Sequence, residues 1–403
     1  MTAVGRAART FATQAQAVQC AQDLAVGFRA RVAQAEAERR LPAESVAELL
    51  ASGLCLLLVP RRFGGSELNY DTVLDVTSII AAACPSTGWV YCLWTAHMWL
   101  IAEMPEHLQA QVFESPNPLV SSVVNTVGTP TLVDGGYRWT GRGFFSSGVD
   151  HCAWLTPAIQ LPVPDGSTER AWFLLQRGDF EIVDDWFTVG LKGTGSKTIE
   201  VQDAFIPMDN ILWVKDLSAG RSPGSALHSG ALYQAGIDFT FSLPVGMPVV
   251  GVARAFLAAY LERVKARING PNQVLAREAL NTLPRLAQAS VDVDTAYALL
   301  LHDVYKYCFA PASDFDDVDK ARCRRDTSHA AQLCRRAVNS LFESSGGSAL
   351  YDTADMQRLW RDGNAAAAHH GLTWDVRGPE FGRVLVGLPA TEPDQHPGAP
   401  SQL

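Results

Sequence analysis

The feature of this sequence that most restricts its fold is a change in the spacing of its apolar residues along the chain. Before about residue 115 apolar side chains recur at helical spacing, and Pro42 and Gly53 bound one such helix at positions typical of a first turn and a C-cap. From 116 to about 213 apolar and polar residues alternate and turns are frequent, as in antiparallel strands. Helical spacing then returns in four long stretches, which indicates a helical bundle.

This order predicts a mainly α fold with a central β-domain. Asp134-Gly135-Gly136 is typical of a hairpin turn inside that domain. The tail from Pro389 is rich in Pro, Gly, Gln and Ser and is predicted to be mobile. We therefore expect an N-terminal helical domain at 1–115, a small antiparallel β-barrel domain at 116–225 and a C-terminal four-helix bundle with its tail at 226–403.

One predicted helix, from about Gly88 to Glu103, is apolar on every face. Ser86 or Thr87 is a plausible N-cap for it, because a hydroxyl oxygen can accept from the first free N–H groups of a helix. A helix without a polar face is buried on all sides. We expect this segment at the centre of the molecule.

Composition indicates a soluble, cytoplasmic, globular protein. The chain has 403 residues, 47% of them hydrophobic, and a net charge of -9, without a basic stretch that would bind nucleic acid. No apolar run approaches the roughly 20 residues needed to span a membrane, and the first residues lack the apolar core of a secretory signal. The eight cysteines form no CxxC pair, which favours reduced thiols over disulfides or a metal site.

Several common cofactor and hydrolase motifs are missing from the sequence. A GxGxxG turn, typical of enzymes that oxidise NAD(P)H themselves, is not present, and neither are HExxH or GxSxG. The string GLKGTGSKT superficially suggests a phosphate-binding loop, but Ser196 follows Gly195 where that loop requires lysine. We therefore predict no metal site and no hydrolase chemistry.

Three strings carry a resemblance to the acyl-CoA dehydrogenase superfamily. They are PRRFGG at 60–65, WTGRGFFSSGVDHCAWL at 139–155 and DDWFTVGLKGTGSKTIEVQDAFIPMDNI at 184–211. The last two resemble the β-domain segments that lie beside the flavin in that superfamily. The helical–β–helical order is also that of the superfamily, so the resemblance extends at low density over the whole chain.

The C-terminal helices distinguish between branches of the superfamily. Dehydrogenases commonly place a glutamate base shortly after an Arg-Asp pair, whereas Arg361-Asp362 is followed here by His369 and His370, with no glutamate before Glu380. A histidine at this place, the FFSSG string and a histidine in the central helix resemble the reduced-flavin (group D) monooxygenases.

That resemblance implies the oxygenase component of a two-component flavin monooxygenase, with a separate NAD(P)H-dependent flavin reductase. Such an enzyme uses reduced FAD, or FMN, and O2 through a C4a-hydroperoxyflavin. The expected reaction is hydroxylation of an aromatic or polycyclic molecule, indole- or phenol-like, in secondary metabolism. The alternatives are an N-oxygenase of an amino sugar, an acyl-CoA dehydrogenase-type FAD enzyme, and a protein that keeps the fold without catalysis. The superfamily also implies a homotetramer.

Three residues are candidates for the chemistry. The resemblance makes Ser147 the acceptor for the flavin N5–H, with Ser146 as the alternative; the structural alternative is a turn serine before Gly148. His97 would face the substrate, although a histidine on an apolar helix is more often a satisfied core residue. His369 is the candidate base, or else a helix C-terminal histidine favoured by the dipole. Only one of His369 and the adjacent His370 can face the flavin, and the spacing in the dehydrogenases would favour His370.

Further residues are candidates for binding. Asn125 would border the flavin pyrimidine, Trp186 would pack on the ring system, and Thr194 and Ser196 would offer hydroxyls and N–H groups to the flavin; each could instead be a turn or core residue. An aromatic lining would suit a flat aromatic substrate. The residues predicted to line the substrate pocket are Trp94, Met98, Trp99, His228, Tyr233, Phe239, Phe241 and His370.

Overall fold

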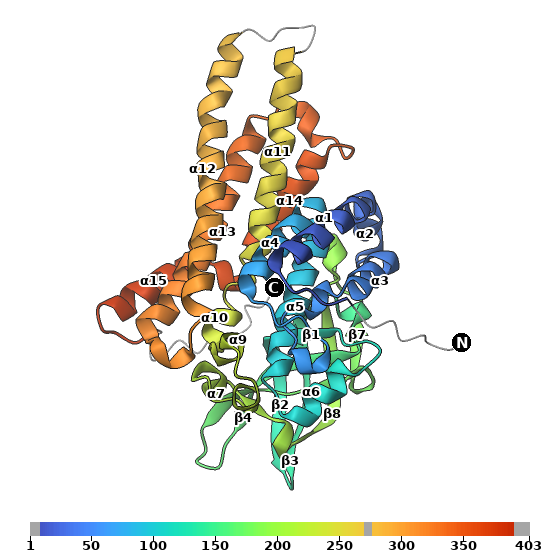
Figure 1. Ribbon diagram of the computed structural model, residues 1–403, viewed down its shortest axis with the longest axis vertical. Helices are drawn as coiled ribbons and strands as arrows, with labels where there is room; N and C mark the ends of the chain where they lie inside the picture. Colours follow the sequence, from blue (N-terminus) through green and yellow to red (C-terminus); the bar gives the residue numbers. More distant parts are fainter. Residues whose placement is uncertain (1–8, 270–275, 391–403) are drawn as a thin grey trace.

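The computed structural model describes residues 9–269 and 276–390, so the predicted mobile tail falls largely outside the described residues. Figure 1 shows the β-domain at one end of the molecule and the long helices α11 and α12 extending from the other. The N-terminal helices lie beside the junction between them. They are α1 (Gln14–Ala30), α2 (Val32–Glu38), α3 (Ala43–Ser52), α4 (Tyr70–Ala83), α5 (Pro85–Ala102) and α6 (Glu106–Phe113).

Helix α5 confirms the expectation of a fully buried central segment. Every residue from Pro85 to Ala102 is buried except the half-buried Leu93. The helix begins at Pro85, earlier than expected, so neither Ser86 nor Thr87 is its N-cap. Proline suits this position because a first-turn N–H has no partner within the helix. On either side, α5 packs against α4 and against strand β1 (Val120–Val123).

The β-domain contains two sheets packed around a shared apolar core. One has the order β1-β4-β5-β9, with β6 also pairing with β4, and the other has the order β2-β3-β8-β7. The expectation of antiparallel strands is wrong for one pair, because β1 and β4 run parallel after the chain has completed the β2–β3 hairpin. The remaining strands are β2 (Asn125–Val133), β3 (Gly136–Ser146), β4 (Trp154–Pro162), β5 (Thr168–Trp172), β6 (Leu175–Gln176), β7 (Phe180–Val183), β8 (Lys197–Pro207) and β9 (Leu212–Trp213).

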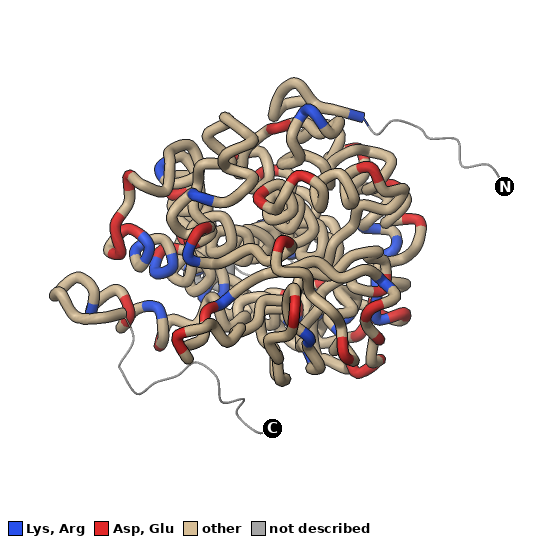
Figure 2. The backbone as a smooth tube through the Cα atoms, turned by 90° about the horizontal axis from the view of Figure 1, so that it is seen from below, with Lys and Arg blue, Asp and Glu red and all other residues tan. Residues whose placement is uncertain are grey.

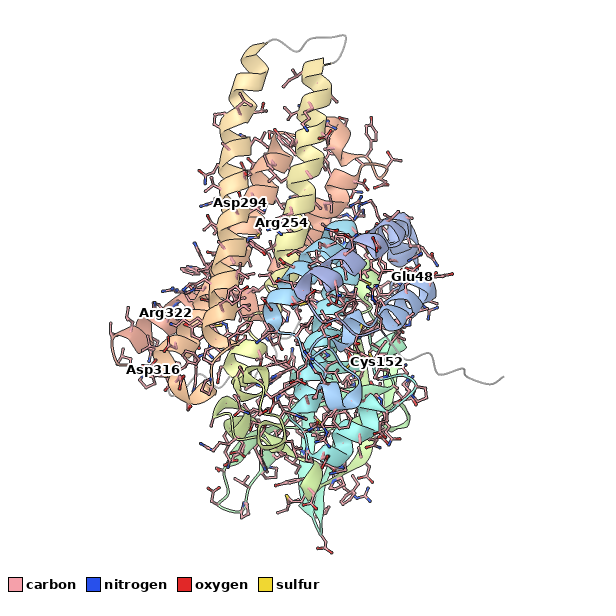
Figure 3. All side chains as sticks on the ribbon, viewed as in Figure 1. Glu48, Cys152, Arg254, Asp294, Asp316 and Arg322 are labelled. Carbon is pink, nitrogen blue, oxygen red and sulfur yellow. The ribbon has the colours of Figure 1, made fainter. Side chains whose placement is uncertain are left out.

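The first sheet has two buried faces with different neighbours. Side chains such as Leu155, Ile159 and Phe173 face the core inside the β-domain. Val120, Ala158 and Trp172 instead belong to the large core shared with the helices. One face of this sheet therefore packs against the helical core that includes α5. Cys152, labelled in Figure 3, belongs to the same core.

The C-terminal part is the predicted helical bundle, and α11, α12, α13 and α14 pack against one another. Arg254 of α11 lies over the ring of Tyr297 of α12, 4.1 Å from its centroid, and holds the long pair together. Between the β-domain and the long bundle helices lie four short helices that the sequence pattern does not predict. They are α7 (Val214–Ser218), α8 (Pro223–Leu227), α9 (Ala231–Gln234) and α10 (Ile237–Thr240). The bundle helices are α11 (Met247–Asn269), α12 (Ala276–Tyr307), α13 (Asp317–Glu343), α14 (Asp355–Ala367) and α15 (Trp374–Leu385).

Charged residues of both signs are spread over the molecule in the view of Figure 2, and many of them lie toward its periphery. All eight cysteines are free and buried. Within the described parts of the chain, no helix combines the length and apolar character that crossing a bilayer requires.

Candidate active site

A row of buried hydroxyl groups lies where strand β3 ends against α5. The indole N–H of Trp89 donates to Ser147 Oγ at 3.2 Å, and Ser147 Oγ lies 2.8 Å from Ser196 Oγ. Ser196 Oγ lies 2.7 Å from Thr194 Oγ1, which donates to the carbonyl oxygen of Leu191 at 2.9 Å. The three hydroxyls come from two loops that sequence reasoning had paired through the resemblance alone.

The bond to the Leu191 carbonyl fixes the direction of the whole row. A hydroxyl has one hydrogen, and the hydrogen of Thr194 is committed to that carbonyl. Ser196 must then donate to Thr194, and Ser147 must donate to Ser196. Ser147 already accepts from Trp89, which leaves one lone pair. The free hydrogen-bonding capacity of Ser147 is therefore that of an acceptor.

The turn that carries Ser147 needs an unusual backbone and a glycine. Phe145 has φ +65°, and Gly148 has φ +69°. A Cβ on Gly148 would lie 2.5 Å from Val90 and 2.8 Å from the Trp94 ring, so only glycine lets the turn press against α5. The Gly148 N–H also donates to the carbonyl oxygen of Thr194 at 2.8 Å, which ties the two loops together.

Ser146 is turned away from this row. Its Oγ lies 2.8 Å from Ser121 Oγ, and Ser121 in turn donates to the carbonyl oxygen of Ser147 at 3.0 Å. Ser146 is fully buried and its hydroxyl is committed to Ser121. The structure therefore separates the two serines of FFSSG, and only Ser147 belongs to the hydroxyl row.

The far end of the row is fastened to the C-terminal bundle. Leu191 has φ +51°, its N–H donates to Asp362 Oδ1 at 2.7 Å, and its carbonyl oxygen also accepts from the Trp186 indole at 3.1 Å. Arg361 donates to the carbonyl oxygen of Val189 at 2.6 Å. Arg361 and Asp362 thus bind α14 to the loop of the β-domain that contains Val189 and Leu191.

His369 lies directly after α14 and close to the row. Its ring centroid is 5.6 Å from that of Trp89, the residue that donates to Ser147. The N–H of Gly371 donates to His369 Nδ1 at 3.1 Å, so the neutral ring carries its proton on Nε2. Burial, followed by the charges of His370 and Arg377, lowers the pKa of His369 to about 3, and the neutral form prevails near pH 7.

His97 is the opposite tautomer to His369, with its proton on Nδ1. Its Nδ1 lies 2.8 Å from the carbonyl oxygen of Val120 and must carry the proton to donate there. Burial lowers its pKa to about 4, so the ring is neutral and Nε2 keeps a free lone pair. His97 is thus an acceptor at Nε2, whereas His369 is a donor at Nε2.

Of the predicted substrate residues, Phe241 and Trp99 lie with His97. The Phe241 ring centroid is 6.0 Å from that of His97, 6.1 Å from that of Trp99 and 5.4 Å from that of Trp172. The short helices after β9 place Phe241 there, and Trp99 anchors them by donating to the carbonyl oxygen of Leu232 at 3.0 Å.

Other predicted pocket residues lie elsewhere. Phe239 stacks on Tyr307 at 4.5 Å in the core beside α12, because it projects from the opposite side of α10 to Phe241. Trp94 packs beneath Gly148 and against His151. His228 bonds Gln109 and packs on Tyr233 inside the fold. Met98 is fully buried within α5, and His370 is exposed beside His369, with ring centroids 4.3 Å apart.

Two predicted flavin residues border an exposed surface. Asn125 begins β2, is exposed and pairs in register with Phe144. Trp186 is half-buried, and its ring meets the 61% exposed Phe145 at 6.3 Å, edge to face. An exposed aromatic pair beside a buried hydroxyl row fits a flat ring system with polar edges, so the residues present are suited to a flavin.

Sequence reasoning missed Trp89, Ser121, Ser122 and Trp172. Ser122 and Trp172 are buried, and neither Ser122 Oγ nor Trp172 Nε1 has a hydrogen-bond partner among the described residues. Strand alternation could have placed Ser121 and Ser122 on opposite faces, but no sequence signal shows which buried polar atoms lack partners.

Comparison with known proteins places this site in a family. Residues 12–113 match the acyl-CoA dehydrogenase N-terminal domain, and residues 243–374 match the acyl-CoA dehydrogenase C-terminal domain. The chain is 35% identical over 380 residues to the oxygenase component of an FADH(2)-dependent resorcinol hydroxylase from Rhizobium sp. (strain MTP-10005), covering 90% of this chain and 91% of that one.

Solved structures agree with these matches. The HsaA monooxygenase from M. tuberculosis superposes with a TM-score of 0.87 and 30% identity, over 95% of this chain and 99% of that one. XiaF from Streptomyces sp., solved with FADH2 and glycerol, gives a TM-score of 0.80 and 25% identity, over 95% and 98% of the two chains. The chain therefore belongs to the acyl-CoA dehydrogenase superfamily and, within it, to the oxygenase components of flavin-dependent monooxygenases.

Proposed function

We propose that this protein uses reduced flavin and O2 to hydroxylate an aromatic small molecule. The observation that carries the proposal is the directed hydroxyl row, which ends in a free acceptor at Ser147 with His369 beside it. Reduced flavin, when bound, supplies the electrons for oxygen activation. Trp186, Phe145, Thr194 and Ser196 are the residues that would hold it against the β-domain.

Ser147 is suited to hold the N5–H of a reduced flavin. Its hydrogen is committed to Ser196, so it cannot compete as a donor toward the ring. Because the row is buried and already hydrogen-bonded, it needs no reorganisation when the flavin binds. An acceptor fixed in this way retains the N5 proton, which a monooxygenase must keep until the substrate has reacted.

The two imidazoles support different roles on the same substrate. His97 Nε2 is a free acceptor and is suited to receive the hydrogen of a substrate hydroxyl. His369 holds its proton on Nε2 and is suited to donate a hydrogen bond at the reacting end. We therefore assign the acceptor role to His97 and a donor role to His369, in place of the base role expected for His369.

The carboxylates of α14 are turned away from the site, which argues against dehydrogenase chemistry. Asp362 accepts from the Leu191 N–H, and Asp355 accepts from Arg358 at 2.9 Å. Glu380, further along, is paired with Arg324 and Arg377. None of these three is free to abstract a proton from a substrate beside Ser147.

The walls near His97 support an aromatic substrate over an amino sugar. The Phe241 ring centroid lies 6.1 Å from that of Trp99 and 5.4 Å from that of Trp172, so aromatic side chains line this region. The resorcinol hydroxylase relative is named for an aromatic diol. A phenol-like or indole-like molecule fits these walls.

The proposed partners follow from the family. A separate NAD(P)H-dependent reductase would supply FADH2 or FMNH2, as the names of the relatives as oxygenase components suggest. We also propose a homotetramer. Large apolar side chains in the C-terminal part of the chain are more than half exposed and would be covered by neighbouring subunits, among them Leu350, Tyr351, Leu385 and Val386.

An anaerobic titration followed by rapid mixing with oxygen tests the proposed function. Reduced FAD or FMN should bind, and oxygen should then produce a transient absorbance distinct from both reduced and oxidised flavin. With a phenol present, the transient should decay with formation of a hydroxylated product. Binding of neither flavin, or flavin oxidation with only peroxide for every aromatic compound, would refute the proposal.

A further inference from the structure

Two buried polar groups without partners share one face of the first sheet. Ser122 is 9% exposed and Trp172 is 3% exposed. Ser122 pairs in register with Thr156, and Trp172 with Ala158, two residues further along the same strand β4. Residues directly opposite each other, and residues two apart in a strand, lie on the same face. Ser122 and Trp172 therefore project to the same side.

That side is the one that faces His97. Val120, Ala158 and Trp172 all belong to the core shared with the helices. The carbonyl oxygen of Val120 accepts from His97, and the Phe241 ring centroid lies 6.0 Å from that of His97 and 5.4 Å from that of Trp172. The lone pair of His97 Nε2 and the indole N–H of Trp172 thus belong to two residues that share one aromatic neighbour.

Leaving an indole N–H buried without an acceptor destabilises the folded protein, so such a group in an enzyme calls for an explanation. An indole N–H can only donate, whereas a serine hydroxyl can donate or accept. A ligand that satisfies Trp172 must therefore offer an acceptor oxygen.

We propose that Trp172, assisted by Ser122, binds a second oxygen of the substrate, which is consequently a phenol with a carbonyl or hydroxyl oxygen at its far end. This inference rests on the proposed function, because it presumes that the phenolic hydroxyl is received by His97. The rings of Trp172 and Phe241 contact the aromatic part of the substrate. The Trp172 N–H selects for an acceptor oxygen at the far end of the substrate.

A matched pair of phenols tests the inference. 4-(4-Hydroxyphenyl)butan-2-one and 4-butylphenol have the same length, and the ketone differs by one carbonyl oxygen that is insulated from the ring. The wild-type complex with reduced flavin should bind the ketone about tenfold more tightly, the worth of one hydrogen bond. In Trp172→Phe the ratio of the two affinities should fall to about one, whatever the change in the affinity for 4-butylphenol.

Trp213→Phe is the matched control, because Trp213 lies on the neighbouring strand β9, is half-buried and packs against the core inside the β-domain. It should keep the tenfold preference. Binding of reduced flavin as tightly as in the wild type shows that Trp172→Phe is folded.

Three results would overturn the inference while the flavin transient persists. They are a preference retained in Trp172→Phe, no preference in the wild type, and binding of neither phenol. Loss of the flavin transient from the wild type would instead overturn the proposed function.

Discussion

The hydroxyl row on the β-domain and the sheet face opposite His97 are both buried and polar, yet they differ in how far their hydrogen bonds are satisfied. In the row, every hydroxyl hydrogen has an acceptor, and the order from Trp89 to Leu191 is fixed. On the sheet face, Ser122 Oγ and Trp172 Nε1 have no partner among the described residues.

The difference distinguishes polar groups whose hydrogen bonds the protein itself provides from polar groups whose hydrogen bonds a ligand must provide. A row in which every hydrogen is committed holds its remaining lone pairs rigidly, that of Ser147 among them, and is suited to a cofactor that binds the same way each time. Polar atoms that are buried without partners carry a cost in the free protein that a suitable ligand removes. We infer that the row serves the flavin and the sheet face serves the substrate.

Replacing His369 should have the largest effect on activity. His369→Ala removes the imidazole beside the row but leaves every hydrogen bond of the row intact. Flavin binding should be kept, while product per flavin oxidised should fall about 100-fold, the usual worth of a proton-handling side chain. Peroxide should appear in place of product, measured in single-turnover reactions.

His107→Ala is the control for this change, since His107 is an exposed histidine that bonds Asn210 far along the chain. It should leave the product yield as in the wild type. An unchanged yield in His369→Ala would remove His369 from the mechanism.

Replacing Ser147 should have an intermediate effect. Ser147→Ala removes the free acceptor and leaves the Trp89 N–H without its partner, at a cost of about 1–3 kcal/mol in the free energy of unfolding. Because the flavin N5 proton would lose its acceptor, the lifetime of the oxygen-dependent transient should fall about tenfold, the effect expected for the loss of one hydrogen bond. Stopped-flow absorbance measures this lifetime directly.

Ser146→Ala sharpens the comparison, because Ser146 is adjacent in sequence but bonds Ser121 instead of joining the row. Its transient should live as long as that of the wild type. A shortened lifetime in Ser146→Ala with a normal one in Ser147→Ala would show that the two serines exchange roles when flavin binds.

The smallest effect concerns Asp362, which accepts from the Leu191 N–H at the end of the hydroxyl row. Burial raises the pKa of Asp362 to about 6 from its ordinary 3.8. A carboxyl with a raised pKa in the folded state contributes stability below about pH 4, and that contribution is lost as the pH rises toward 6. The loss is at most about 1.4 kcal/mol for each pH unit.

Asp362→Asn keeps an oxygen for the Leu191 N–H but cannot ionise. As the pH rises from 4 to 6, the free energy of unfolding of the wild type should therefore fall relative to that of the variant. Chemical denaturation at several pH values measures this difference. The exposed Asp355 of the same helix is the control, as Asp355→Asn. Parallel pH profiles for the wild type and Asp362→Asn would contradict the assignment.

Much of the fold could be predicted from the sequence, because it depends on periodicity. The buried α5, the β2–β3 hairpin and the bundle helices all follow from the spacing of apolar residues. The four short helices from α7 to α10 could not be predicted, because segments of four or five residues have no periodicity and are stabilised by contacts such as Trp99 with Leu232.

The candidate site could be predicted only in part. The resemblance predicts Ser147, Ser196 and Thr194 as site residues. The direction of their hydrogen bonds depends on Trp89, which lies far from them in sequence, and on the local turn that brings Thr194 to the carbonyl oxygen of Leu191. Phe239 and Phe241 could not be distinguished, because the turn of α10 decides which of them reaches His97. Trp172 was missed, because a lone tryptophan in a strand pattern indicates only a core residue.

A crystal structure of the protein with reduced flavin tests the central claim most directly. We predict that N5 lies within hydrogen-bond distance, about 2.7–3.2 Å, of Ser147 Oγ, that His369 is on the reactive side of the ring, and that Asp362 remains bonded to the Leu191 N–H. A flavin whose N5 has no contact with Ser147, or a carboxylate from α14 that reaches the reactive face while His369 is turned outward, would contradict the account.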